Sequence, residues 1–230
     1  KNLARRCREH GCKVFGQLFH GGSSIRSSLD GSRRPVFGPS PTPHMRYGST
    51  AVPASNELVW KWVEGYGRSA SHLAAGDLDG VEVLASMGYL ISQFLNPHSN
   101  LREDEFGGSF ENRIRFLCEV LKRIRESIDD TMPLGVRISA EEFVDEGLTP
   151  EEVLDICIAL DERKLVDYIS VIGGSSAAVS GWIHGFPPMA IPHAYLAEHA
   201  AVIKQRVGVP VLVAGRINQP QMAEQILAAE

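Results

Sequence analysis

The chain has 230 residues, a formal net charge of −5, and 43% hydrophobic and 22% charged residues. This length allows one large domain or two small ones with a sizeable core, and the composition is that of a globular protein. The acidic balance provides no basic stripe, so nucleic acid is not an expected partner. No apolar run approaches the roughly 20 residues of a membrane span, and residues 1–10 lack the apolar core of a signal peptide. We therefore expect a cytoplasmic protein with no membrane contact.

The first half of the chain alternates helical and strand-like patterns. Residues 1–11 have the apolar spacing of a helix, and residues 12–19 form an apolar run typical of a strand. Residues 23–55 are rich in serine, proline and glycine, which predicts a surface loop long enough to act as a lid. A helix over residues 57–75 and a buried strand over residues 79–84 follow.

The second half begins with a long polar loop and then continues the same alternation. Its predicted elements are a helix over residues 109–128, a strand over 133–139, a helix from 150 to about 163, a strand over 166–172, a helix over 193–207, a strand over 209–214 and a helix over 219–229. Thr149 and Glu152 predict a capping box, with Pro150 at the first helical position.

These elements predict an α/β protein. Strands that are apolar on both faces are typical of parallel sheets covered by helices. Glycines and polar residues gather at the C-terminal end of each predicted strand. In an open parallel sheet or a barrel, ligands bind at that edge.

The cysteines and histidines predict no metal site. The four cysteines lack a C-x-x-C pair, and the eight histidines lack an H-E-x-x-H spacing. We interpret the cysteines as buried thiols, neither a disulfide framework nor metal ligands: Cys7, Cys12, Cys118 and Cys157.

Arg137 and Gln17 are polar side chains inside apolar strands. Burying a guanidinium is costly unless an anion or a set of acceptors meets it, so Arg137 either pairs with a strand carboxylate such as Glu82 or contacts an electron-rich ligand ring. The amide of Gln17 both donates and accepts, which suits the imide edge of a heterocycle. It equally suits a neighbouring backbone group.

Three further features lie at predicted strand ends. Gly215 would let the backbone approach a phosphate and Arg216 would add a fork of donors, although an ordinary tight turn has the same pattern. Tyr89 is either a proton donor or a packing residue. The aromatic residues Trp182 and Phe186, with His184 between them, either surround a cation or flat substrate or form core beneath a loop.

Several motifs together resemble a known family. Residues 79–116 contain GVEV…GYL..QFLNP..N.R.DEFGGS.ENR.RF; residues 17–22 are QLFHGG, residues 135–139 are GVRIS, and residues 209–218 are VPVLVAGRIN. They resemble the old yellow enzyme family, the NADH:flavin oxidoreductases, over essentially the whole chain. The first motif is too long and too particular to arise by chance.

The resemblance implies a fold and a cofactor. Members of the family hold flavin mononucleotide (FMN) on a (β/α)8 TIM barrel, and the five strands here would be about the third to seventh of that barrel. Residues 1–230 would then be a partial FMN-binding barrel domain, truncated at both ends, which by itself should not hold flavin well. The family also implies a small-molecule substrate and allows a homo-oligomer.

The resemblance further assigns roles by position. Gln17 and Arg137 would contact the pyrimidine edge of the flavin, and Arg137 would stabilise negative charge on the reduced ring. Gly215 and Arg216 would hold the phosphate, and Tyr89 would protonate a substrate. The expected substrate-binding residues are Leu84, Met87, Trp182 and His184.

One departure from the family pattern bears on the reaction. Classical members carry a His-x-x-His or His-x-x-Asn pair where this chain has Leu84 and Met87, neither of which donates a hydrogen bond. The chain is similar in this respect to the dienoyl-CoA reductase branch, and it also resembles the trimethylamine dehydrogenase branch. Members of both usually carry an iron–sulfur cluster and sites for FAD or NAD(P)H, which here would lie outside these residues.

We therefore expect an FMN-dependent oxidoreductase that transfers hydride between a small organic substrate and flavin. An N-methyl amine oxidative demethylase suits the apolar Leu84 and Met87, because amine oxidation needs no acid. The alternative is an NAD(P)H-dependent 2,4-dienoyl-CoA (enoate) reductase with Tyr89 as acid. A second alternative is a non-catalytic barrel remnant that acts as a binding module.

Overall fold

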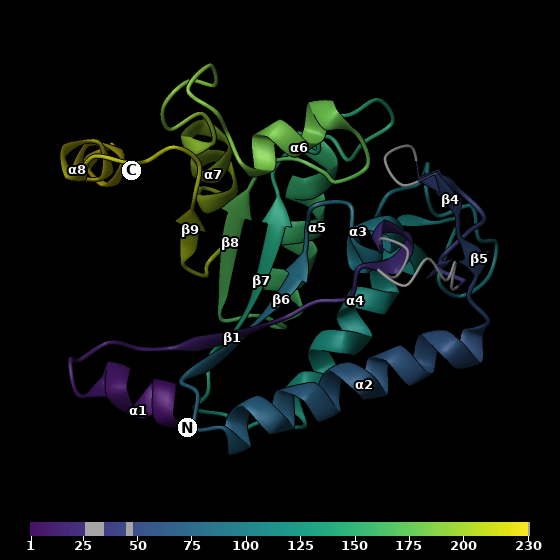
Figure 1. The fold of residues 1–230 in the computed structure, drawn as a ribbon, viewed down its shortest axis with the longest axis horizontal. Coiled ribbons are helices and arrows are strands. Elements are labelled where there is room, and N and C mark those ends of the chain that lie inside the picture. Colours follow the sequence, from purple (N-terminus) through teal and green to yellow (C-terminus); the bar gives the residue numbers. More distant parts are fainter. Residues whose placement is uncertain (26–34, 45–47, 230) are drawn as a thin grey trace.

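A five-stranded parallel sheet forms the centre of the chain (Figure 1). The computed structural model describes residues 1–25, 35–44 and 48–229. The strands lie in the order β1 (Phe15–Leu18), β6 (Gly80–Ala85), β7 (Leu134–Ser139), β8 (Tyr168–Ile172) and β9 (Val211–Val213), and every neighbouring pair is parallel. The five predicted strands and the α/β class are therefore confirmed.

Helices connect the strands, as a parallel sheet requires. They are α1 (Asn2–Arg8), α2 (Asn56–Ala75), α3 (Leu90–Leu95), α4 (Phe110–Arg125), α5 (Pro150–Glu162), α6 (Val179–Gly185), α7 (Ala197–Lys204) and α8 (Pro220–Ala228), with a 3-10 turn, η1, at Gly22–Ser24. The predictions located all of these helices except α3 and α6, which lie in segments predicted as loops. Helix α7 begins four residues later than expected.

Side chains at three helix starts satisfy backbone N–H groups that have no partner within the helix: Ser55 at α2, Ser109 at α4 and Thr149 at α5. The Ser55 hydroxyl accepts a hydrogen bond from the backbone of Leu58 at 3.2 Å, which caps α2. At the start of α5, the Thr149 hydroxyl and the Glu152 carboxylate bond to each other's backbone N–H groups at 3.4 and 3.1 Å. The predicted capping box is therefore confirmed.

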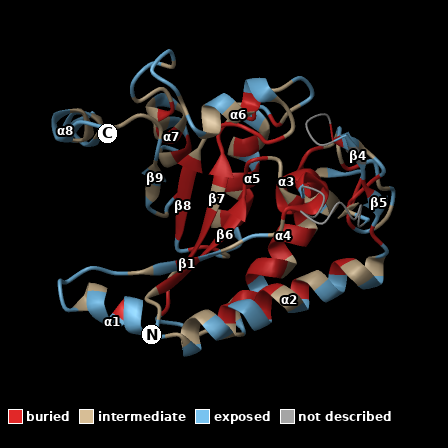
Figure 2. Cartoon of the chain, viewed as in Figure 1, coloured by how far each residue is buried: buried red, intermediate tan, exposed pale blue. Residues whose placement is uncertain are grey.

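The central strands lie at the core and the outer strands are more exposed (Figure 2). All six residues of β6 are buried, and Leu134, Val136 and Ile138 of β7 are fully buried. In the edge strands, Phe15 of β1 is 42% exposed and Leu212 of β9 is 50% exposed. The centre of the sheet is thus more deeply buried than its two edge strands.

The segment after β1 contains short strands that the sequence did not predict. Strands β2 (Phe37–Gly38) and β5 (Val52–Pro53) pair in parallel, and β3 (Pro43–His44) pairs antiparallel with β4 (Ser49–Thr50). Residues 26–34 and 45–47 of the predicted lid lie outside the described residues.

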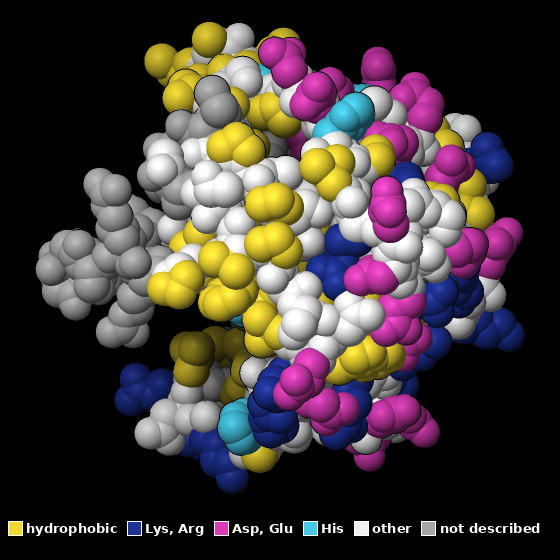
Figure 3. Space-filling model, turned by 90° about the vertical axis from the view of Figure 1, so that its right-hand side faces the viewer, with side chains coloured by type: hydrophobic (Ala, Val, Ile, Leu, Met, Phe, Trp, Pro, Cys, Tyr) yellow, Lys and Arg dark blue, Asp and Glu magenta, His cyan; other side chains and the backbone are white. Residues whose placement is uncertain are grey.

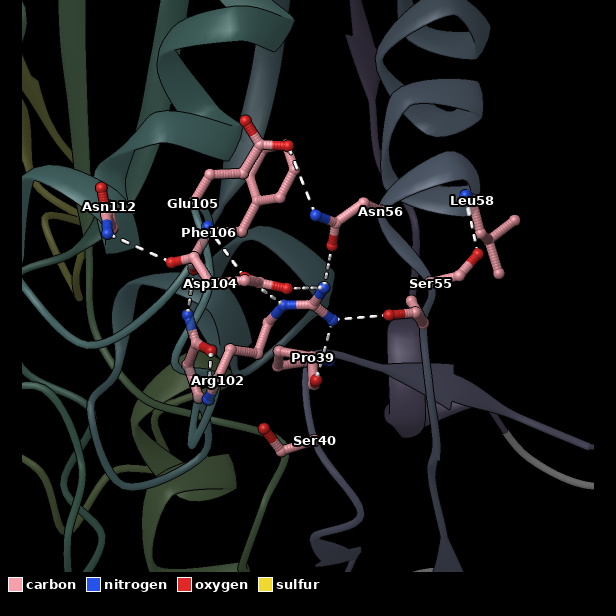
Figure 4. Close-up of polar contacts among 12 residues, drawn as sticks. Pro39, Ser40, Ser55, Asn56, Leu58, Arg102, Asp104, Glu105, Phe106 and Asn112 are labelled. Atoms are coloured by element: carbon pink, nitrogen blue, oxygen red, sulfur yellow. Dashed lines mark hydrogen bonds and ion pairs between the residues drawn. The ribbon is translucent and has the colours of Figure 1, made fainter.

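Arg102 fastens this segment to the loop between α3 and α4 (Figure 4). Its guanidinium donates to the carbonyl oxygens of Ala54 at 2.6 Å and Pro39 at 3.2 Å, and to Asn56 at 2.5 Å. It also forms an ion pair with Asp104 at 2.6 Å. This part of the long motif therefore holds three separate segments together.

In Figure 3, acidic and basic side chains are interspersed over the face that is shown. No described helix is long and apolar enough to cross a membrane.

Cys118 and Cys157 are buried as predicted, but Cys12 is exposed and Cys7 is half-buried, because they lie at the surface-exposed N-terminal end of the chain. The prediction of buried thiols was wrong for those two.

Candidate active site

A cavity of about 480 Å³ lies at the C-terminal edge of the sheet. Helix α6 lies beyond the arrowheads of β7 and β8 at this edge (Figure 1). The cavity is lined by Gln17, Leu84, Met87, Tyr89, Arg137, Ile172, Gly173, His184, Gly185, Phe186, Pro187, Ala214, Gly215 and Arg216. Eight of the nine predicted site residues are in this lining. The exception is Trp182, whose ring lies 4.9 Å from the ring of Phe186.

The strand register explains how the polar side chains meet. Gln17 of β1 pairs with Glu82 of β6, Glu82 pairs with Gly135 of β7, and Gly135 pairs with Tyr168 of β8. Paired residues of neighbouring strands point to the same face, so these positions form one row across the sheet. Arg137 lies two residues beyond Gly135, on the same face and one row nearer the C-terminal edge.

Glu82 joins the two residues predicted to contact the flavin ring. Its carboxylate accepts a hydrogen bond from the Gln17 amide at 2.7 Å and forms an ion pair with Arg137 at 3.3 Å. The ion pair was one of the two alternatives for Arg137. Because Arg137 also lines the cavity, the ion pair does not remove it from the candidate site.

A strained turn sets the position of Tyr89. Met87 and Gly88 both have left-handed backbone conformations, with φ of 62° and 66°. The Ser139 hydroxyl accepts from the Met87 N–H at 3.2 Å, and the Met87 carbonyl accepts from the Ser176 N–H at 2.8 Å. A Cβ on Gly88 would lie 2.4 Å from the Ser175 hydroxyl oxygen. The turn therefore needs glycine, and it brings Tyr89 to the cavity.

Gly215 and Arg216 follow β9 on the other side of the cavity. Arg216 has φ of 53°, and its guanidinium donates to the carbonyl oxygens of Pro188 at 3.1 Å and Met189 at 2.7 Å, and to that of Ile191. A Cβ on Gly215 would lie 3.0 Å from the Tyr195 ring, so the chain packs closely here. Arg216 thus orders the loop after α6 and also lines the cavity.

His184 is part of the cavity lining, and its ring packs against the rings of Phe143 and Tyr195. Its ring stacks on Phe143, with 3.7 Å between centroids and 7° between planes, and its carbonyl oxygen accepts from the Tyr195 hydroxyl. Burial lowers the pKa of His184 below its ordinary value, which favours the neutral ring. Its Nδ1 atom is buried without a hydrogen-bond partner among the described residues.

The residues around this cavity fit a flavin nucleotide. An amide and a guanidinium lie on one side, where a pyrimidine edge with alternating donors and acceptors would meet them. A glycine and an arginine lie on the other side, which suits a phosphate. The volume is within the range of small-molecule sites. No group of three His, Cys, Asp or Glu side chains among the described residues could hold a metal ion.

Tyr168 is a residue of this region that local sequence patterns did not point to. Tyr168 donates a hydrogen bond to Glu82 at 3.3 Å, and the Tyr168 ring fills the space that a Gly135 side chain would occupy, 2.1 Å from an ideal Cβ. The apolar runs that became β7 and β8 were visible in the sequence, but the register that faces Gly135 with Tyr168 was not.

Comparison with known proteins identifies the family. Residues 1–230 match the NADH:flavin oxidoreductase / NADH oxidase family, and the chain belongs to this family of oxidoreductases. It is 36% identical over 228 residues to N,N-dimethylglycine/sarcosine dehydrogenase of Chromohalobacter salexigens, covering 99% of this chain and 33% of that protein. It is 33% identical over 227 residues to NADPH dehydrogenase of a Geobacillus species, covering 99% of this chain and 62% of that protein.

Solved structures agree on the fold. A 2-naphthoyl-CoA reductase in complex with 2-naphthoyl-CoA superimposes with a TM-score of 0.85 at 27% identity, covering 99% of this chain and 36% of that one. Histamine dehydrogenase from Rhizobium sp. 4-9 gives a TM-score of 0.84 at 21% identity, covering 99% and 32%. The predicted part of a (β/α)8 barrel is therefore confirmed. The chain spans about a third of these two proteins.

Proposed function

We propose that the protein containing this chain is an FMN-dependent oxidoreductase that removes hydride from a small N-methylated amine. The observation that carries the proposal is the convergence of Gln17, Arg137, Gly215 and Arg216 on one cavity. When bound there, FMN would supply a ring that takes up or releases hydride. The similarity to N,N-dimethylglycine/sarcosine dehydrogenase supports the amine as substrate.

Different residues of the chain would bind the flavin ring, the phosphate and the substrate. Gln17 and Arg137 would hold the pyrimidine edge, with the guanidinium stabilising negative charge on the ring. Gly215 and Arg216 would hold the phosphate. Leu84 and Met87, both buried at the cavity, offer an apolar surface with no hydrogen-bond donor. That surface suits a substrate whose oxidation needs no proton from the protein.

A reductase of conjugated acyl thioesters is the second candidate. The position of Tyr89 in the cavity lining favours it, because a tyrosine hydroxyl there could protonate a substrate carbon. The structural likeness to a 2-naphthoyl-CoA reductase also supports it. In this reaction NAD(P)H would be the hydride source.

Anaerobic bleaching of the flavin distinguishes these candidates in the intact natural protein. Sarcosine or N,N-dimethylglycine should bleach the flavin absorbance without a nicotinamide. If these amines leave the spectrum unchanged, while NAD(P)H bleaches it and a conjugated acyl thioester restores it, the protein is the reductase. A colourless protein that cannot be reconstituted with FMN would instead be a non-catalytic binding module.

The proposal extends to groups beyond these residues. The resemblance implies an iron–sulfur cluster and a site for FAD or NAD(P)H elsewhere in such a protein. Iron and acid-labile sulfide analysis, with chromatography of the released flavins, tests both. If FMN is the only flavin released and no iron is found, the protein has neither the iron–sulfur cluster nor a bound FAD.

A further inference from the structure

Glu82 is a buried carboxylate that contacts two residues of the candidate flavin site but does not itself line the cavity. It is 9% exposed and is not part of the cavity lining, whereas Gln17 and Arg137 are. Its Oε1 accepts from Gln17 and pairs with Arg137, and its Oε2 accepts from the Tyr168 hydroxyl. Among the described residues, the hydrogen bonds and the ion pair of its carboxylate therefore lead to Gln17, Arg137 and Tyr168.

The first consequence concerns which way the Gln17 amide points. An ionised carboxylate accepts hydrogen bonds and cannot donate them, so Glu82 requires the NH₂ group of Gln17 at 2.7 Å. The carbonyl oxygen of the same amide is then left as an acceptor on the side of the cavity. An acceptor at that place selects a ligand edge that carries an N–H group.

The second consequence concerns charge. Arg137 brings a positive charge to the cavity, and Glu82 at 3.3 Å brings a negative one beside it. Because both side chains lie on the same, partly desolvated face of the sheet, the carboxylate offsets much of the field that the guanidinium would exert on a bound ring. The Tyr168 hydroxyl, by donating to Glu82, in turn offsets part of the carboxylate's charge.

Gly135 makes this row possible. It stands between Glu82 and Tyr168 in the register, and its lack of a side chain lets the Tyr168 ring lie across β7 and reach Glu82. Any larger residue at position 135 would displace the ring, since an ideal Cβ would lie 2.1 Å from it. The geometry of four neighbouring strands thus specifies the environment of one carboxylate.

We propose that Glu82 is a positioning residue of the flavin site: it orients Gln17 to accept from the imide N–H, and it moderates the charge of Arg137 so that the bound flavin keeps a lower reduction potential. The inference rests on the proposed function, because it needs FMN in the cavity. It adds a residue that touches neither cofactor nor substrate.

The test measures the reduction potential of bound FMN in the intact natural protein and in a Glu82→Gln variant. Loss of the negative charge should stabilise reduced relative to oxidised flavin about tenfold, which is a positive shift of about 30 mV for a two-electron couple. Glu64→Gln is the matched control, because Glu64 also pairs with an arginine, Arg123 at 2.9 Å, but on the outer helices. It should leave the potential unchanged.

A Tyr168→Phe variant distinguishes an electrostatic role of Glu82 from a merely structural one, because only the electrostatic role predicts the direction in which the reduction potential shifts. It removes the O–H that offsets the charge of Glu82, so the potential should shift in the negative direction, opposite to Glu82→Gln. If both variants shift the potential in the same direction, or neither shifts it, the inference is overturned. If Glu82→Gln does not fold, Tyr168→Phe alone decides: a negative shift of the potential supports the inference, and a positive or absent shift overturns it.

A binding measurement tests the orientation of Gln17. The wild-type protein should bind FMN at least tenfold more tightly than an FMN analogue methylated at the imide nitrogen, and Glu82→Gln should reduce that ratio at least threefold. An unchanged ratio would refute the orienting role. If the wild-type protein binds neither flavin, the proposed function fails as well; if it binds FMN and the variants behave as wild type, only this inference fails.

Discussion

The guanidinium of Arg102 donates a 2.6 Å hydrogen bond to the carbonyl oxygen of Ala54, 48 residues earlier in the chain. This contact joins the loop after α3 to the short strands that precede α2 (Figure 4). The Arg102 side chain is 8% exposed and also pairs with Asp104. The long motif thus carries structural residues beside the ones that reach the cavity.

Arg102→Met should be strongly destabilising. It leaves the Asp104 carboxylate, which is 37% exposed, and two backbone carbonyl groups without their donor, and a buried acceptor left unsatisfied typically costs about 1–3 kcal/mol. The free energy of unfolding from urea titration measures the loss. Lys61→Met is the control, because the pair of Lys61 with Glu57 is exposed and should contribute at most about 0.5 kcal/mol. Equal losses in both variants would contradict the anchoring role.

Gly88→Ala should damage both stability and the site. The left-handed conformation alone costs about 1–2 kcal/mol with an alanine, and the new Cβ would collide with Ser175. The turn must then shift, and Tyr89 shifts with it, so FMN-dependent turnover should fall as well. Gly65→Ala in α2 is the control: its Cβ would meet only Arg68 at 3.9 Å, and it should stabilise the helix by up to about 1 kcal/mol.

Tyr89→Phe should separate the two candidate reactions. If Tyr89 is the acid of a reductase, the rate of acyl thioester reduction should fall roughly 100- to 10,000-fold with little change in substrate binding. Amine oxidation should stay within a few fold of wild type, because it needs no proton from the protein. Single-turnover kinetics in a stopped-flow instrument measures both, and an unchanged flavin content shows that the variant is intact. A large loss of amine oxidation would contradict the role proposed here.

Local patterns in the sequence were sufficient to predict the sheet. The five apolar runs and the glycines after them identified β1, β6, β7, β8 and β9, because strands buried on both faces carry continuous apolar residues. The same reasoning identified Gln17 and Arg137 as polar side chains inside apolar strands and as candidates for ligand contact. Their convergence with Gly215 and Arg216 on one cavity is now a structural observation, while their roles stay predictions.

Contacts between distant segments could not be predicted in the same way. All six residues of α3 are buried, so packing rather than a periodic pattern stabilises this short helix. The two-residue strands β2 and β5 exist only because Phe37 and Val52 are brought together. Trp182 was expected at the cavity by its place in the chain, but α6 turns its ring toward Phe186 at the edge of the lining.

Acid should weaken the fold through Asp79, at the start of β6. The Val14 N–H at 3.0 Å, and then Arg8 and Lys13, stabilise its charged form and hold its pKa at about 2, below the ordinary 3.8. A lowered pKa in the folded state contributes stability above about pH 4, and this contribution disappears as the pH falls towards 2. Wild type should therefore exceed Asp79→Asn in thermal midpoint at pH 7, with the difference shrinking between pH 4 and 2.

Arg8→Met tests the cause of this acid sensitivity. It removes one cation but leaves Asp79 its backbone donor Val14, which is the largest contribution to the lowered pKa. The variant should therefore keep most of the acid dependence and show its loss of stability at a slightly higher pH than wild type. Calorimetric scans from pH 7 to pH 2 provide the comparison. A gap between wild type and Asp79→Asn that stays constant over this range would show that the carboxylate acts by shape and not by its charge.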